Sequence, residues 1–205
     1  MTRQRYIRSL LATIFLSLFC APASSQGSDG ATKASKESPK LAVHAGRYSN
    51  YQYGFRFRIP KGMRGTSAPP PLPQHGLTIK LSKGSDSSAQ IVAFAFYDGL
   101  EWSSLQGAVK AELAQAKKDS SEFVLRRRGR FRLGSLRAAR LYYESKDRDS
   151  GAVDATELVV AYKSAPEGDA PIVYELWLET TPARYPKDKR TFDKILRTWK
   201  AIPIE

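Results

Sequence analysis

Residues 126–140 read RRRGRFRLGSLRAAR, with seven arginines in this one short stretch. Gly134 and Ser135 stand between two segments in which large apolar residues recur, and a Gly-Ser pair at such a point favours a tight turn between antiparallel strands. The stretch therefore predicts a β-hairpin. Its arginines raise a functional question, because they suit either an anion-binding surface or a solvated edge strand that resists pairing.

The strand before the turn places its arginines in a row. If residues 123–133 form one uninterrupted strand, alternate side chains lie on opposite faces of the sheet. Side chains on one face are then spaced by about 7 Å. The arginines that share this face are Arg126, Arg128, Arg130 and Arg132.

The strand after the turn has two possible registers. A two-residue turn pairs Leu133 with Leu136 and places Arg137 beside the arginine row, whereas a three-residue loop places Arg140 there. Turn chemistry favours the first register and the hydrophobic pattern favours the second. We take the second as the prediction, and a bulge at Gly129 would reconcile the two.

The segments around the hairpin predict an α+β fold. Five of them have the composition of strands, at residues 53–60, 77–81, 90–97, 157–163 and 171–180. Helical spacing of apolar residues predicts one helix of about four turns after Ser103 and Ser104 and another that begins near Pro186. Short connections between strands favour antiparallel pairing. We expect a mainly antiparallel β-sheet of about six to seven strands covered by two α-helices.

Residues 1–23 have the layout of a secretory signal peptide. Three arginines precede an apolar run at residues 10–20, and small residues follow, with cleavage expected after Ala23. The run is short for a transmembrane span, so a retained anchor is the alternative and no span is expected after cleavage. Cleavage removes three of the 33 basic residues and none of the 20 acidic ones, which leaves a net charge of +10. We expect an exported protein, periplasmic or secreted.

The mature chain is predicted to hold one domain behind a tether. Residues 24–46 contain mostly Ser, Gly, Lys, Ala and Asp, which bury too little apolar surface to offset the entropy of ordering. We therefore expect a disordered tether at 24–46 and a single α+β domain at 47–205.

Several segments resemble the PsbP-like superfamily, which includes the extrinsic photosystem II protein and the bacterial DcrB proteins. Residues 48–63, YSNYQYGFRFRIPKGM, are similar to its opening: an aromatic residue, a Gly-Phe strand, a proline and a turn. Similarity continues through the Leu-Gly turn and the strand that follows it, 133–143, the segment 173–176 and the closing helix. The resemblance implies an antiparallel sheet flanked by helices and a role in binding or assembly. It transfers no functional residue.

No constellation for catalysis or metal binding is visible. Ser135 follows a glycine, but the G-x-S-x-G pattern of a nucleophile elbow is missing. Cys20 lies in the expected leader, and His44 and His75 are not at ligand spacing. We predict no catalytic residue, no metal site and no cofactor.

Glu175 and Glu179 are the one carboxylate pair on a single strand face that invites a catalytic interpretation. Four residues along a strand separate them by about 13 Å. This separation exceeds that of the acid and base in glycoside hydrolysis. We expect both to face solvent as partners of arginines on a neighbouring strand.

The sequence therefore predicts an exported, non-enzymatic binding or assembly factor of the cell envelope. Its partner is expected to be an acidic protein or an anionic envelope component, and the absence of an RNA-binding motif or recognition helix disfavours nucleic acid. The candidate partner-binding residues are Arg126, Arg128, Arg130, Arg132 and Arg140. Two alternatives stay open: a direct binder of anionic lipid or glycan, and an enzyme whose site only the fold assembles.

Overall fold

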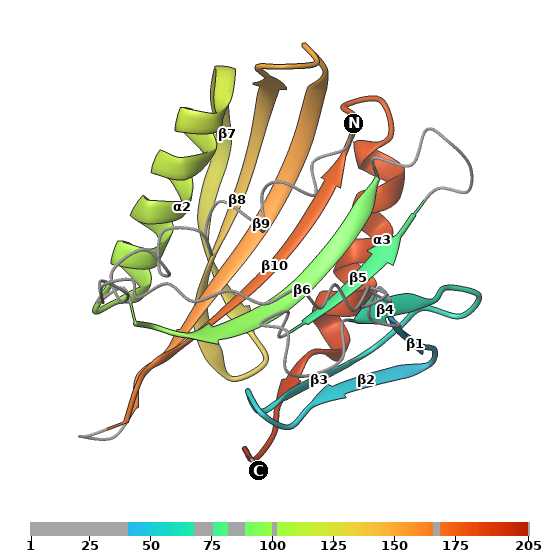
Figure 1. The fold of residues 1–205 in the computed structure, drawn as a ribbon, viewed down its shortest axis with the longest axis vertical. Coiled ribbons are helices and arrows are strands. Elements are labelled where there is room, and N and C mark those ends of the chain that lie inside the picture. The colour runs from blue at the N-terminus through green and yellow to red at the C-terminus, as the bar shows by residue number, and fades with distance from the viewer. Residues whose placement is uncertain (1–40, 68–75, 82–88, 100–101, 166–168, 205) are drawn as a thin grey trace, which may run out of the picture. The chain divides into compact units, whose positions relative to one another are not determined.

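The computed structural model describes residues 41–67, 76–81, 89–99, 102–165 and 169–204. Over these residues the chain forms an eight-stranded sheet, a three-stranded sheet and two helices, and every strand pair is antiparallel (Figure 1). The predicted α+β class is confirmed. The expected six to seven strands are fewer than the eight strands of the large sheet. A strand of only three residues is too short to show an alternating pattern of apolar and polar residues in the sequence.

The large sheet has the strand order β1-β4-β5-β6-β10-β9-β8-β7. In chain order its strands are β1 (Ala42–His44), β4 (Gly65–Ser67), β5 (Gly76–Lys80), β6 (Gln90–Tyr97), β7 (Ser120–Leu133), β8 (Leu136–Asp147), β9 (Val153–Lys163) and β10 (Ile172–Thr180). Strands β7 to β10 form a meander of successive neighbours, and β10 then pairs with β6. Strand β7 is consequently one edge of the sheet.

The small sheet has the order β11-β3-β2. Its strands are β2 (Arg47–Asn50), β3 (Phe55–Arg58) and β11 (Lys200–Ala201). Strand β3 alternates as its sequence predicts, because Phe55 and Phe57 are buried while Arg56 and Arg58 are exposed.

The two helices cover opposite faces of the large sheet (Figure 1). Helix α2 (Leu105–Asp119) packs on β7, β8 and β9, and helix α3 (Tyr185–Thr198) packs on β10 and β3. The predicted cap is confirmed at Ser104, whose Oγ accepts a hydrogen bond from the Gly107 backbone N–H at 3.1 Å. This bond satisfies one of the amide groups that a helix start leaves without a partner.

Apolar residues are buried on both faces of the sheet. On the α3 face, Trp199 stacks against Phe55 with ring centroids 6.3 Å apart and meets Tyr174 edge to face at 5.3 Å. On the α2 face, Leu141 and Val160 belong to a second buried cluster. Strands β8, β9 and β10 therefore lie between two hydrophobic layers, whereas most residues of the edge strand β7 are exposed.

The expected tether does not extend to residue 46. Ala42 to His44 form β1 and pair antiparallel with Ser67 to Gly65, and His44 Nε2 lies 2.8 Å from Ser67 Oγ. Residues 24–40 of the expected tether and the expected leader at 1–23 lie outside the described residues. Neither of the described helices has the length and apolar character needed to cross a membrane.

Candidate functional site

The hairpin between β7 and β8 turns at Gly134 and Ser135. Leu133 pairs directly with Leu136, so the loop has two residues and the three-residue register that we expected is wrong. Gly134 has φ of 58°, whereas among the described non-glycine residues only Ser103 has a positive φ. A positive φ at the first turn residue alone is typical of the type II′ turn, which glycine permits.

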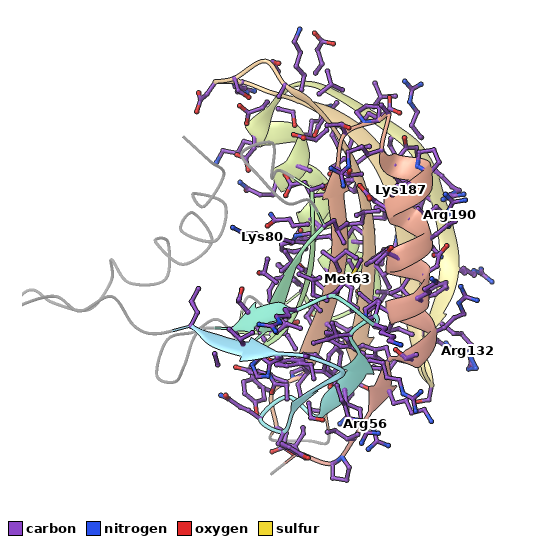
Figure 2. All side chains as sticks on the ribbon, turned by 90° about the vertical axis from the view of Figure 1, so that its right-hand side faces the viewer. Arg56, Met63, Lys80, Arg132, Lys187 and Arg190 are labelled. Carbon is purple, nitrogen blue, oxygen red and sulfur yellow. The ribbon has the colours of Figure 1, made fainter. Side chains whose placement is uncertain are left out.

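This register places four arginines on one face of the hairpin. Arg132 lies opposite Arg137, Arg130 opposite Ala139 and Arg128 opposite Leu141. We call the four residues Arg128, Arg130, Arg132 and Arg137 the arginine surface. All four are exposed, and Figure 2 shows Arg132 on the outer side of the hairpin.

The charges of the arginine surface have no counter-ion in the part of the chain that the structure describes. No carboxylate of the described residues lies within 4.0 Å of the guanidinium nitrogens of these four arginines. Arg132 and Arg137 lie directly opposite each other, and like charges in that relation destabilise a strand pair. The fold therefore holds a group of positive charges that an anion would stabilise.

Arg126 does not belong to this surface. The pairing of β7 with β8 shifts between Leu125 and Arg127, which marks an extra residue at Arg126. The Arg126 guanidinium binds Glu144, with Nη2 2.9 Å from Oε2. The predicted row fails at this position because one inserted residue breaks the two-residue alternation that places side chains on a face.

Arg140 lies on the opposite face of β8 and has a different role. Its Nε donates to Oε1 of Glu157 at 2.7 Å, and its Nη2 donates to Asp193 of α3. Burial lowers the pKa of Arg140, but the hydrogen bonds to Glu157 and Asp193 outweigh burial and raise it overall. Arg140 is thus part of the packing between the sheet and α3.

Glu157 is the centre of this polar network beneath α3. Its side chain is completely buried, and it accepts hydrogen bonds from Arg140, from Arg127 at 3.1 Å and from the Tyr185 hydroxyl at 3.0 Å. Burial and the adjacent Glu157 carboxylate raise the pKa of Tyr185. Two hairpin arginines therefore compensate a buried charge, as buried ions require.

A pair of carboxyl groups between α2 and β10 was missed by the sequence interpretation. Glu175 is 1% exposed rather than solvent-facing, and its carboxyl group lies beside that of the partly buried Glu112 on α2. Burial raises the pKa of Glu112 to about 7, and burial together with the Glu112 charge raises the pKa of Glu175 well above its ordinary value. Two carboxyl groups this close favour sharing a proton.

The expected solvent-facing role fails for Glu175 because the neighbouring strand is apolar on both faces. Glu175 pairs in register with Phe94 of β6, and Phe94 contacts Trp177 edge to face at 4.9 Å. Glu179, two positions beyond Trp177 on β10, accepts a hydrogen bond from Gln90 at 3.1 Å. The sequence of residues 90–97, which is apolar on both faces, could have indicated this burial. A strand that pairs with such a central strand has its polar residues covered as well.

Within the described ranges, no group of three or more His, Cys, Asp and Glu side chains is arranged to hold a metal ion. The carboxyl pair of Glu112 and Glu175 is a candidate acid–base site by its pKa values alone. The Glu175 carboxyl group is buried beneath α2, and among the described residues its Oε1 has no hydrogen-bond partner. The arginine surface is an exposed cluster with chemistry suited to a partner.

Comparison with solved structures identifies the fold. The chain is similar to PsbP from the cyanobacterium Synechocystis sp. PCC 6803, with a TM-score of 0.51 and 15% identity over 85% of this chain and 98% of that one. It is also similar to LpqN of Mycobacterium tuberculosis, which is involved in cell envelope biogenesis, with a TM-score of 0.54 and 14% identity over 82% of this chain and 88% of LpqN. No family model and no curated protein sequence matches the chain. The protein has a PsbP-like fold, as its sequence predicted.

Proposed function

We propose that this chain is an exported, non-enzymatic binding or assembly factor of the cell envelope that contacts an acidic partner protein through the arginine surface. One observation carries the proposal: four exposed arginines share one face of a hairpin, with no carboxylate of the described residues in ion-pair range. Guanidinium groups bind carboxylates in a bidentate manner, and a field of one sign steers acidic partners toward it.

Two further facts support the proposal. The first residues have the layout of an export signal, and LpqN, which shares the fold, is involved in cell envelope biogenesis. The arginines of the hairpin have two different roles. Arg126, Arg127 and Arg140 pair with carboxylates of the chain itself, whereas the arginine surface has charge available for a second molecule.

The proposal is tested by capturing partners from the envelope fraction with the full chain. In the test variant the arginine surface is changed to alanine: Arg128→Ala, Arg130→Ala, Arg132→Ala and Arg137→Ala. The control variant removes the same charge from exposed arginines elsewhere: Arg47→Ala, Arg56→Ala, Arg58→Ala and Arg64→Ala.

We expect wild type and control to capture the same acidic protein and the test variant to capture at least tenfold less, by quantitative mass spectrometry. Equal capture by all three chains would remove the arginine surface from the function. Retention on anionic liposomes or heparin that only the test variant loses, without a protein partner, would instead favour direct binding of lipid or glycan.

A further inference from the structure

Three of the four residues of the arginine surface, Arg128, Arg130 and Arg132, lie on an edge strand whose outer backbone pairs with no strand of the described residues. Among the described strands, β7 is the last of the large sheet and pairs only with β8. In the described part of the chain, no hydrogen bond from outside this ladder reaches the backbone of residues 122–133. Alternate N–H and C=O groups of this segment therefore point outward, where an added strand would find partners.

The arginine half of β7 also extends beyond helix α2. Helix α2 has 15 residues and β7 has 14, which correspond to lengths of about 22 Å and about 46 Å. The helix connects directly to the start of β7, so it cannot cover the strand along its whole length. Figure 1 shows the turn of the hairpin lying past the end of α2.

We propose that the acidic partner binds by adding an extended segment as a ninth strand alongside β7. This inference rests on the proposed function and specifies how the same surface recognises its partner. Neighbouring strands lie about 4.8 Å apart, and alternate side chains of a strand are about 7 Å apart on one face. Acidic residues at every second position of the added strand therefore lie beside Arg128, Arg130 and Arg132.

The face of β7 opposite the arginines determines which residues of the added strand suit the positions between its acidic residues. Phe131 lies on that face between Arg130 and Arg132, is partly exposed, and has the Arg140 guanidinium 5.3 Å from its ring centroid. An apolar side chain at the intervening position of the added strand packs on Phe131. The recognised motif is accordingly an alternation of acidic residues with apolar residues between them.

The same charges exclude a second copy of this chain as the added strand. Two β7 edges pairing with each other would bring their arginines into neighbouring positions on one face, where like charges repel. Charged edge strands protect natural sheets from such self-association. The edge is therefore selective: it disfavours another β7 and favours an acidic strand.

The inference is tested with synthetic peptides and the full chain. The first peptide, Ac-EVEVEVEVE-NH2, alternates acidic and apolar residues. A second has the same composition in the order EEVVEEVVE, so that its acidic side chains divide between both faces. A third has the first sequence with N-methyl groups on alternate backbone nitrogens, which removes hydrogen-bond donors and retains charge. Binding is measured by fluorescence anisotropy.

We expect the alternating peptide to bind at least tenfold more tightly than the rearranged and N-methylated peptides. Its binding should protect backbone amides of residues 122–133 from hydrogen exchange. The Arg128, Arg130, Arg132 and Arg137 alanine variant should lose this binding, and the control variant with Arg47, Arg56, Arg58 and Arg64 changed should keep it.

Two results would overturn strand addition and leave the proposed function standing. One is equal affinity for all three peptides combined with loss in the arginine-surface variant, which indicates charge recognition without a strand. The other is absence of new amide protection in residues 122–133 on binding. A wild-type dimer joined through β7 would also overturn the inference. If neither peptide binding nor partner capture depends on the arginine surface, the proposed function fails as well.

Discussion

Arg140 Nε donates to Glu157 Oε1 over 2.7 Å, and this contact joins β8 to β9 beneath α3. The buried Glu157 carboxylate depends on it, because the second arginine that binds Glu157, Arg127, is largely exposed. The hairpin thus carries arginines of two kinds: some compensate a buried acid, and others face outward without a described counter-ion.

Replacing Arg140 tests how much an arginine that compensates a buried acid stabilises the fold. Arg140→Leu leaves a buried charge undercompensated, so we expect the free energy of unfolding to fall by about 3 kcal/mol. Arg132→Leu on the outward face is the matched control and should change it by less than about 0.5 kcal/mol. Urea unfolding followed by circular dichroism measures both. Similar losses for the two variants would mean that the Arg140 network does not stabilise the fold.

The carboxyl pair predicts a dependence of stability on pH. The folded chain has raised pKa values at Glu112, about 7, and at Glu175, so it retains protons that the unfolded chain loses above about pH 4.5. The contribution of Glu112 to stability is therefore lost as pH rises from about 4.5 through about 7, and that of Glu175 is lost as pH rises through its own raised pKa.

Glu175→Gln removes one charge of this pair and keeps the size and shape of the side chain. We expect the variant to be more stable than wild type at pH 8, by up to about 3 kcal/mol, and to differ little at pH 5. Urea unfolding at both pH values gives the comparison. Parallel changes of stability with pH in the two proteins would contradict proton sharing in the folded state.

The hairpin turn depends on Gly134. A Cβ at this position would lie 3.1 Å from the Trp199 ring, and the backbone has φ of 58°. Gly134→Ala should therefore destabilise the protein by more than about 1 kcal/mol. Gly129→Ala, at a position with open space and no positive φ, should be neutral or slightly stabilising. Thermal unfolding of both variants tests this, and equal melting temperatures would refute the role of the turn.

The start of α2 depends on the Ser104 cap. Ser104→Ala removes the acceptor for the Gly107 N–H and should lower the free energy of unfolding by about 1 kcal/mol. Ser104→Asp should restore it, because Asp caps helices and places a negative charge near a first turn that has no acidic residue. An alanine variant as stable as wild type in urea would show that the cap contributes little.

The sequence predicted those elements whose spacing of apolar residues matches the residues that are buried in the fold. Alternation in 55–58 identified a half-buried strand, and Phe192, Ile195 and Leu196 identified the buried stripe of α3. The hairpin register was missed because both faces of β8 are covered. Ala138 packs with the α3-side cluster and Leu141 with the α2-side cluster, so apolar residues on alternate faces do not select one register.

The sequence predicted an arginine-rich face on a hairpin, but it identified only some of the residues on that face. Arg128, Arg130 and Arg132 share a face as the alternation predicted. Arg126 left the row through a bulge that no glycine or proline marks, and Arg137 replaced Arg140 once the register was fixed. Burial of Glu175 depends on α2 lying over β9 near β10, a tertiary contact that alternation along one strand cannot reveal.

The pairing of β11 with β3 has a consequence for the order of folding. Lys200 pairs with Arg56 and Ala201 with Phe55, so the third strand of the small sheet comes from a segment far downstream of β2 and β3 in the sequence. A chain that is synthesised N-terminus first makes β2 and β3 early, but it cannot complete that sheet until residues 200–201 have been synthesised. Until then the aromatic side of β3 lacks Trp199, which makes a truncated chain a natural substrate for chaperones and proteases.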